Sequence, residues 1–335
     1  MSFPSILVTG GCGFIGSHFI TYIFDKYPDI PIVNIDVMYY CASLDNIPKY
    51  IQEDNRYTFI SANITNAPLI ETLLKTYKIT HVIHFAAQSH VQNSFSDALQ
   101  YTNDNVVGTH TLLECCRKYK RLELFVHIST DEVYGESAHD TDSKKNEQSI
   151  LCPTNPYAAT KAAAEMLVQS YYHSFDFPVI ITRGNNVYGN NQYPEKVIPL
   201  FFKQLSENKK ITIQGDGSCV RAFMHVDDVV RAIDTIVQKG IVGEIYNIGC
   251  DDGMEISILE LAEKIILLVK KVSDTTDWLT YIPDRPFNDK RYYISNSKLK
   301  SLGWSVSIQL DEGLGRYFTK IFKKNDEPNE LRTKL

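Results

Sequence analysis

Short apolar runs rich in β-forming residues alternate with longer segments of helical spacing over the first half of the chain. In most of the intervals between the runs, apolar residues recur three and four positions apart, as at 16–27, 67–77 and 106–119. This repeated strand–helix alternation predicts an α/β fold, a doubly wound parallel sheet covered by helices. The six runs lie at 5–10, 31–36, 57–62, 80–86, 124–130 and 178–184.

The alternation breaks after about residue 190. Longer amphipathic stretches follow at 196–209, 211–237 and 256–271, punctuated by Gly, Pro and Asn. We therefore predict a larger lobe at 1–190, a smaller carboxyl-terminal lobe mainly at 191–322, and a polar tail at 323–335. The chain can weave between the two lobes, so the boundary is an approximate one.

Composition and charge exclude several classes of protein. The chain has 335 residues, with 34 Lys and Arg against 40 Asp and Glu and a net charge of −6, and it has no basic stripe for nucleic acid or a membrane surface. No apolar run reaches the roughly 18 residues that span a bilayer. The seven cysteines lack the spacing of disulfide frameworks or metal sites. We expect free thiols, no metal and a cytoplasmic protein.

A glycine-rich turn follows the first predicted strand. Gly10, Gly13 and Gly16 form G-x-x-G-x-x-G, a spacing that admits a pyrophosphate against the backbone and aims a helix N-terminus at its charge. The second strand ends at Asp36, about twenty residues further on, where a carboxylate accepts both hydroxyls of an adenosine ribose and repels a 2′-phosphate. The pattern predicts a Rossmann-type site for NAD rather than NADP. The alternative is a tight turn with a surface Asp.

A second candidate site lies in "NPYAATK" at 155–161. Asn155 can cap a helix whose first turn holds Pro156, so Tyr157 and Lys161 share one helix face. A neighbouring ammonium favours the phenolate and lowers the pKa of the Tyr, and the same ammonium can hold a nicotinamide ribose. Tyr157 is then a base for a hydroxyl proton, although this spacing also occurs by chance in many helices.

Two adjacent carboxylates, Asp131 and Glu132, follow the predicted strand at 124–130 directly. Buried like charges repel each other and lose hydration, so stability gives no reason for them. Paired carboxyls in a partly dry site have separated pKa values, which suits a base beside an acid. A solvated acidic turn is the alternative.

Taken together, the motifs resemble the extended short-chain dehydrogenase/reductase superfamily, and within it the nucleoside-diphosphate-glucose (NDP-glucose) 4,6-dehydratases. The likeness runs from about residue 5 to 320 and is greatest to the UDP-glucose 4,6-dehydratases of rhamnose biosynthesis, with the dTDP-glucose group next. Sugar 4-epimerases of the superfamily keep the Ser/Thr, Tyr and Lys but carry small or neutral residues in place of Asp131 and Glu132. The motifs are "TGGCGFIG", "HFAAQSHV", "STDEVYGE", "NPYAATK", "TRGNNVYG" and "RPFNDKRY".

The resemblance implies catalytic roles for Thr130, Asp131, Glu132, Tyr157 and Lys161. Tyr157, with Thr130 hydrogen-bonded to the sugar O4, takes the C4 hydroxyl proton while the C4 hydride passes to NAD⁺. Glu132 then removes the C5 proton and Asp131 protonates the departing C6 hydroxyl. The hydride returns to C6, so the expected product is the NDP-4-keto-6-deoxy-glucose, an early intermediate of rhamnose or other deoxysugar synthesis.

Further binding residues also follow from the resemblance. Two positions depart from the family pattern: Asn63 stands where Asp is common near the adenine, and Gln88 replaces the Glu of bacterial dTDP-glucose enzymes. Each substrate residue taken alone could instead be a surface salt-bridge group. For NAD the expected residues are Gly10, Gly13, Phe14, Ile15, Gly16, Asp36, Asn63, Ile64, Ala86, Ala87, Tyr157 and Lys161. For the sugar nucleotide they are Ser89, Thr130, Asn186, Lys196, Arg221, Asn247, Arg285 and Asn288.

Two other functions stay open on the sequence. A sugar-nucleotide 4-epimerase would use the same cofactor and Tyr157 without losing water, and an NAD-binding scaffold would form no product. For assembly, the helices beginning near Asn105 and Pro156 resemble those that form a four-helix dimer interface in the superfamily. We expect a homodimer.

Overall fold

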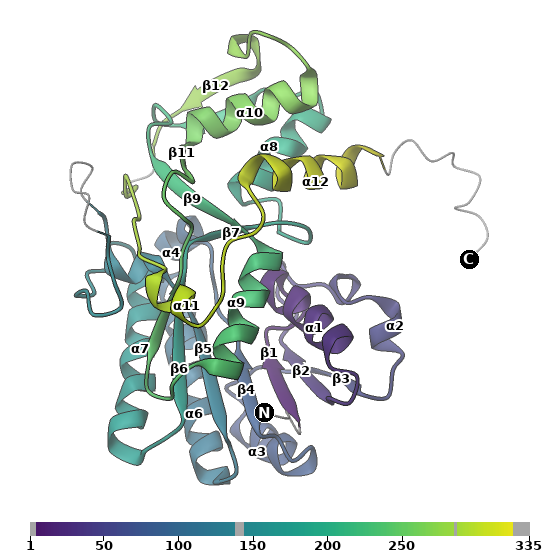
Figure 1. Cartoon of the computed structure of the whole chain (residues 1–335), viewed down its shortest axis with the longest axis vertical. Coiled ribbons are helices and arrows are strands. Elements are labelled where there is room, and N and C mark those ends of the chain that lie inside the picture. The colour runs from purple at the N-terminus through teal and green to yellow at the C-terminus, as the bar shows by residue number, and fades with distance from the viewer. Residues whose placement is uncertain (1–4, 138–143, 285–286, 324–335) are drawn as a thin grey trace.

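A seven-stranded parallel sheet forms the base of the molecule (Figure 1). The computed structural model describes residues 5–137, 144–284 and 287–323. The strand order β10-β6-β5-β4-β1-β2-β3 places a change of winding direction between β1 and β4, where such sheets bind ligands. The strands are β1 (Ile6–Thr9), β2 (Ile32–Asp36), β3 (Tyr57–Ser61), β4 (His81–His84), β5 (Leu124–Thr130), β6 (Val179–Gly184) and β10 (Ile245–Ile248).

Helices cover both faces of this sheet, as its buried strands require. On one face α1 (Phe14–Lys26) packs beside α9 (Val226–Lys239), and the short α2 (Lys49–Gln52) adds Ile51 to the same core. On the other face lie α3 (Ala67–Thr76), α6 (Gly108–Tyr119) and α7 (Pro156–Phe175), packed in that order. The apolar side chains of each strand alternate between the two cores, as period-two geometry predicts.

The connection from β4 to α6 is irregular. It runs through α4 (Val91–Ser96) and α5 (Ala98–Tyr101) into a π-helical stretch, η2 (Thr102–Val107). π-helical turns often occur beside functional sites. Here η2 places Asp104 and Asn105 against the loop that follows β4. In that loop the backbone N–H of Gln88 donates to the Asn105 side chain, and the Gln88 side-chain amide donates to Asp104.

The smaller lobe lies at the carboxyl ends of the large sheet's central strands, in the upper part of Figure 1. Its core is a separate apolar cluster that includes Phe202, Ile213 and Ile265. Its strands are β7 (Asn186–Tyr188), β8 (Ile211–Gln214), β9 (Val220–His225), β11 (Glu255–Ser257) and β12 (Leu279–Ile282). Its helices, which pack around β8, are α8 (Val197–Ser206), α10 (Ile258–Lys270) and α12 (Leu310–Lys323). Short helical elements elsewhere along the chain include η1 (Leu44–Asn46), η3 (Asp131–Tyr134), η4 (Thr276–Trp278) and α11 (Ser297–Ser301).

The fold class predicted from the sequence is confirmed, and all six predicted strands form. The chain also weaves: after α9 it returns to the large sheet as β10, well beyond residue 190. The division into lobes at 190 therefore stays an approximate prediction. Within the predicted tail, 324–335 lie outside the described residues. No described helix combines the length and apolar composition of a bilayer-spanning segment.

Candidate active site

The glycine-rich turn packs tightly between β1 and α1. Gly10 has φ +69°, in the left-handed region that favours glycine. A Cβ on Gly10 would lie 2.7 Å from the Ala86 backbone, and a Cβ on Gly16 would lie 2.4 Å from the Gly10 oxygen. The N-terminus of α1 has no side-chain cap, so its backbone N–H groups remain available to an anion. These features fit a pyrophosphate cradle.

Asp36 lies beside that turn at the end of β2. Its carboxylate accepts hydrogen bonds from the backbone N–H groups of Cys12, at 2.9 Å, and Met38, at 2.8 Å. Burial raises its pKa, and these two hydrogen bonds act in the opposite direction. A hydrogen-bonded, buried carboxylate at this place suits the ribose role predicted from the sequence.

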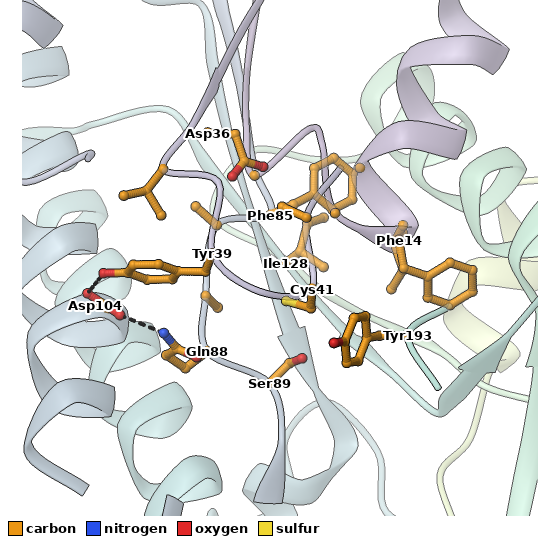
Figure 2. Close-up of a pocket in the computed structure, with 18 of the residues that line it drawn as sticks. Phe14, Asp36, Tyr39, Cys41, Phe85, Gln88, Ser89, Asp104, Ile128 and Tyr193 are labelled. Carbon is orange, nitrogen blue, oxygen red and sulfur yellow. Dashed lines mark hydrogen bonds between the residues drawn. The ribbon is translucent and has the colours of Figure 1, made fainter. Parts of the chain in front are cut away.

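A large cavity extends from Asp36 past the glycine turn to Tyr157. Phe14, Phe85 and Ile128 give it apolar walls, as Figure 2 shows. The turn, the carboxylate and the long apolar-walled space together fit a dinucleotide. All twelve residues predicted for NAD line this cavity: Gly10, Gly13, Phe14, Ile15, Gly16, Asp36, Asn63, Ile64, Ala86, Ala87, Tyr157 and Lys161.

Helix α7 presents Tyr157 and Lys161 to the cavity. Asn155 caps it as predicted, accepting from the Ala158 N–H at 2.9 Å, and a proline occupies its first turn. The Lys161 ammonium donates to the Ile128 carbonyl at 2.6 Å, and burial lowers its pKa to about 8.

The electrostatic expectation for Tyr157 was wrong. Its pKa is raised rather than lowered, first by burial and then by the charge of Glu132, while a hydrogen bond with Thr130 acts in the opposite direction. Sequence spacing revealed the lysine one turn away, but it could not reveal the desolvation that raises this pKa.

The acidic pair starts the 3-10 turn η3 directly after β5. Thr130 caps the turn, and its hydroxyl accepts from the Glu132 N–H at 3.3 Å. Asp131 is only 2% exposed, and burial followed by the charge of Glu132 raises its pKa to about 7. Its Oδ2 accepts from the Asn185 amide at 2.7 Å. Asp131 can therefore hold a proton near neutral pH.

Glu132 has different neighbours from Asp131. Burial raises its pKa, but a hydrogen bond from the Asn155 amide to its Oε2, at 3.2 Å, favours the carboxylate. The positive charges of Arg221 and Lys196 act in the same direction. The N-cap of α7 thus also supports the ionised form of Glu132.

A second cavity begins at Glu132 and extends into the smaller lobe. Its wall is more polar than that of the first cavity, and it includes five of the eight predicted substrate residues. Thr130 lines neither cavity and adjoins them through its hydrogen bonds to the Glu132 N–H and to Tyr157. Arg285 lies outside the described residues. The five in the wall are Ser89, Asn186, Lys196, Arg221 and Asn288.

Asn247 is not brought to either cavity, and we no longer assign it to the substrate. It is fully buried in β10, where its Oδ1 accepts from the Tyr134 hydroxyl at 2.8 Å and its N–H donates to Glu147 at 3.0 Å. The strand β10, at the edge of the large sheet, turns this side chain into the core, away from both cavities.

The two cavities share part of their walls. Ser89, Gln192, Glu195 and Lys196 line both of them, and the Lys196 ammonium donates to the Ser89 carbonyl at 2.7 Å. Tyr157 lines the first cavity and Glu132 lines the second, and the two residues are near enough for the charge of Glu132 to raise the pKa of Tyr157. A group held in one cavity can therefore react with a group held in the other.

Sequence reasoning missed several residues of the site. Glu195 accepts from the Tyr40 hydroxyl at 2.9 and 3.0 Å, which ties the loop after β2 to the smaller lobe. Tyr292 and Asp289 line the second cavity and are hydrogen-bonded at 2.5 Å. A signal existed, because Glu195 adjoins Lys196 and the other pair lies in "RPFNDKRY". In the described ranges, no grouping of three His, Cys, Asp or Glu side chains could hold a metal ion.

Comparisons with known proteins agree with this geometry. Relatives include a dTDP-D-glucose 4,6-dehydratase of Homo sapiens, 46% identical over 92% of this chain and 87% of the relative. The Dictyostelium discoideum protein of the same name is 43% identical over 96% and 82%. A trifunctional Arabidopsis thaliana protein that includes UDP-glucose 4,6-dehydratase is 44% identical over 92% of this chain and 46% of its own length.

Solved structures extend the comparison. A dTDP-glucose 4,6-dehydratase of Streptomyces venezuelae with NAD and TYD bound has a TM-score of 0.88 at 35% identity, covering 97% of this chain and 99% of that one. The Bacillus anthracis enzyme in complex with NAD has a TM-score of 0.86 at 38% identity, covering 96% and 97%. A Bacillus cereus UDP-glucuronic acid 4-epimerase reaches 0.85 at 32%, covering 96% and 99%, so the fold alone does not separate the two activities. The family model described as GDP-mannose 4,6 dehydratase matches residues 7–317, and the chain belongs to that family.

Proposed function

We propose that this chain catalyses the NAD-dependent 4,6-dehydration of a nucleoside-diphosphate-glucose to the NDP-4-keto-6-deoxy-glucose. The observation that carries the proposal is the adjacent pair of buried Asp131 and half-buried Glu132 beside Tyr157, at the region where the two cavities meet. A 4-epimerase needs the tyrosine but has no use for an acid and a base at C5 and C6. Dehydration needs all three groups.

The cofactor cavity is assigned to NAD. The glycine turn and the start of α1 hold the pyrophosphate, Asp36 holds the adenosine ribose, and Lys161 holds the nicotinamide ribose. Bound NAD accepts the hydride from C4 of the sugar and returns it to C6, so it is unchanged over the whole cycle. Its positively charged nicotinamide would also favour the phenolate of Tyr157, against the burial that raises the pKa of this residue.

Oxidation at C4 needs a group that takes the hydroxyl proton. Tyr157 lies in the cofactor cavity and is hydrogen-bonded with Thr130, so the two hydroxyls together can bind the sugar O4. Tyr157 accepts the proton, and Lys161 supplies positive charge one helical turn away. The resulting C4 ketone acidifies the C5–H bond.

Elimination then uses the acidic pair. Glu132, whose ionised form Asn155 and two nearby cations favour against the effect of burial, removes the C5 proton. Asp131, whose pKa of about 7 keeps a proton available, protonates the O6 atom as the C6–O bond breaks. Water leaves, and addition of hydride at C6 and a proton at C5 completes the product. The sum of these steps is the substrate minus one water.

The substrate cavity is assigned to the sugar nucleotide. Arg221 and Lys196 supply the positive charge that a pyrophosphate needs, while Asn186 and Asn288 supply amides. The sequence motifs favour UDP-glucose, and dTDP-glucose is the second candidate. Gln88 contributed to that preference. It lines the cofactor cavity but not the substrate cavity, and its side chain donates to Asp104 at 2.8 Å. It is therefore not placed to recognise the base of the sugar nucleotide.

A direct assay tests the activity and the nucleotide together. The purified protein would be mixed with NAD and either UDP-glucose or dTDP-glucose, and the products weighed by mass spectrometry. We expect a loss of the mass of one water, with faster turnover of UDP-glucose. An unchanged mass with a new stereoisomer would identify an epimerase, and no product from either substrate would identify a scaffold. Equal turnover of both would remove the preference for UDP-glucose.

The setting of the reaction is proposed on separate grounds. All seven cysteines are free thiols, which suits the reducing cytosol. For assembly, Val107 of η2 and Met166 of α7 are 48% and 49% exposed, at the helices predicted to form a four-helix homodimer interface. Burial of these side chains in a dimer would remove apolar surface from water. A monomeric mass by light scattering at micromolar concentration would contradict the dimer.

A further inference from the structure

A buried arginine behind the acidic pair is part of neither cavity. Arg183, near the end of β6, is 2% exposed, and its partner Glu165 is 0% exposed. The guanidinium donates to the Glu165 carboxylate through Nε at 3.0 Å and Nη2 at 2.6 Å. Its Nη1 donates to the Tyr134 hydroxyl at 2.8 Å and to the Glu147 carbonyl at 3.3 Å. Tyr134, Glu147, Glu165, Arg183 and Asn247 form what we call the Arg183 cluster.

The cluster connects the two elements that carry the proposed catalytic groups. Glu165 lies on α7, one turn after Lys161 and two turns after Tyr157. Tyr134 ends η3, the turn that begins with Asp131 and Glu132. Arg183 therefore contacts both elements at once, on the side away from the substrate.

Asn247 completes the cluster. It pairs with Arg183 in the β10–β6 register, and its Oδ1 accepts from the same Tyr134 hydroxyl that Arg183 contacts. The Arg183 guanidinium also lies over the Tyr134 ring, 4.7 Å from its centroid. The hydroxyl of Tyr134 is thus fixed from two strands, and η3 is fixed with it.

Stability alone does not account for such a cluster. Replacing a buried ion pair by apolar side chains of similar volume is often neutral or stabilising, because burial removes both charges from water. A planar guanidinium with several fixed donors does, however, define the relative position of the groups it binds. The benefit that the cluster supplies is geometric.

Glu165 also acts on Lys161 electrostatically. Burial lowers the pKa of Lys161, and the charge of Glu165 opposes that shift. The other titratable groups that face the ammonium are His84 on β4 and His127 on β5, and burial lowers the pKa of each, so both stay neutral. The carboxylate of Glu165, together with the Ile128 carbonyl that accepts from the ammonium, therefore favours the charged form of Lys161.

We propose that Arg183 is a positioning residue whose ion pair with Glu165 and hydrogen bond to Tyr134 hold the Tyr157–Lys161 helix and the Asp131–Glu132 turn in one arrangement. Oxidation at C4 and elimination across C5 and C6 can then act on a single sugar pose. The inference rests on the catalytic roles proposed above for those four residues.

The test removes one connection at a time. Tyr134→Phe deletes the hydroxyl that joins η3 to Arg183 and keeps the ring. Tyr246→Phe is the matched control, because its buried hydroxyl accepts from the Ile241 N–H at 2.9 Å, away from both cavities. Each variant, loaded with NAD, would be mixed rapidly with UDP-glucose and followed by NADH absorbance, C5 deuterium incorporation, product formation and thermal unfolding.

For Tyr134→Phe we expect the NADH transient to form at the wild-type rate and decay more slowly. A displacement of about 1 Å at a catalytic group can cost roughly a hundredfold, so product formation should fall by about ten- to a hundredfold with little change in KM. The Tyr246→Phe control should keep the wild-type ratio of NADH decay to formation. If Tyr134→Phe matches that control in this ratio, the cluster is merely structural and the proposal is wrong.

Glu165→Gln tests the second connection by a different readout. It keeps the shape of the side chain but removes the charge, so the pKa of Lys161 should fall further. The rate of NADH formation, which depends on Lys161 and not on the acid Asp131, should then decline at a lower pH than in the wild type. An unchanged basic limb would contradict the role of Glu165. Failure of the wild-type protein to dehydrate a nucleotide sugar would instead refute the proposed function, whatever these variants do.

Discussion

Asp131 and Glu132 are neighbours in the chain, yet their surroundings separate their chemistry. Asp131 receives one amide hydrogen bond and has the charge of Glu132 beside it, which together with burial raises its pKa to about 7. The charge of Arg221 acts on both carboxyls, whereas Lys196 and the Asn155 amide favour the ionised form of Glu132. One carboxyl is therefore suited to give a proton and the other to take one at the same pH.

The acid role of Asp131 predicts a pH dependence. The acid must be protonated, so kcat/KM should fall as pH rises through about 7, the pKa of Asp131. In Asp131→Asn the rate should drop by roughly 10²–10⁴-fold because a general acid is lost. The remaining basic limb should then begin near 8, where Lys161 loses its proton. A limb that stays at 7 in this variant would assign it to another group.

The tyrosine gives a separate prediction at the same scale. Tyr157→Phe keeps α7 and Lys161 in place but removes the group that accepts the C4 proton. NAD should still bind, and adding UDP-glucose should produce no NADH transient by rapid-mixing absorbance. A normal transient would show that another group starts the oxidation.

Residue types could be predicted from motifs more easily than residue environments. Tyr157 and Asp36 were found from spacing, because a helix face and a strand end are local properties. The upward pKa shift of Tyr157 and the inward direction of Asn247 depend on packing between distant segments, which no local pattern records. Glu195 was missed although it adjoins Lys196, because its role depends on a contact with Tyr40, which is distant in the chain.

Helix and strand ends, rather than their middles, carry the site. The N-cap of α7 supports Glu132, the end of β5 leads into the acidic pair, and the start of α1 faces the pyrophosphate position. Strong signals marked these ends in the sequence: a glycine turn, an Asn-Pro cap and adjacent carboxylates. The π-helical η2 had no such signal, since its extra residue per turn arises from packing and side-chain hydrogen bonds.

The glycine turn yields a prediction for an element. A Cβ at position 16 would meet the Gly10 oxygen at 2.4 Å, so Gly16→Ala must displace the turn. NAD affinity should weaken by about tenfold or more, a cost of about 1.4 kcal/mol or more. Gly315→Ala, on α12, is the control, because its Cβ meets no atom within 4 Å. Titration of NAD by fluorescence would compare them, and equal affinities would argue against the cradle.

At the scale of the molecule, the larger lobe supplies most of the cofactor cavity and the smaller lobe most of the substrate cavity. The parallel sheet brings the carboxyl ends of β1, β2, β4 and β5 to one edge, where the cofactor cavity lies. The smaller lobe adds the polar cavity, and the loop at 192–196 lines both. Strand–helix alternation predicted the first lobe well. The second could only be outlined, because its small sheets pair strands that are distant in the chain.

The central claim is that Glu132 is the base that removes the C5 proton, the step that distinguishes dehydration from epimerisation on the same fold. Glu132→Gln keeps nearly the same volume but cannot accept the C5 proton, so oxidation at C4 should survive while elimination slows by roughly 10²–10⁴-fold. Rapid mixing of this variant with UDP-glucose would follow NADH absorbance together with solvent deuterium incorporation at C5. The account predicts persistent NADH with little exchange at C5. Product formation at the wild-type rate with full C5 exchange would contradict it.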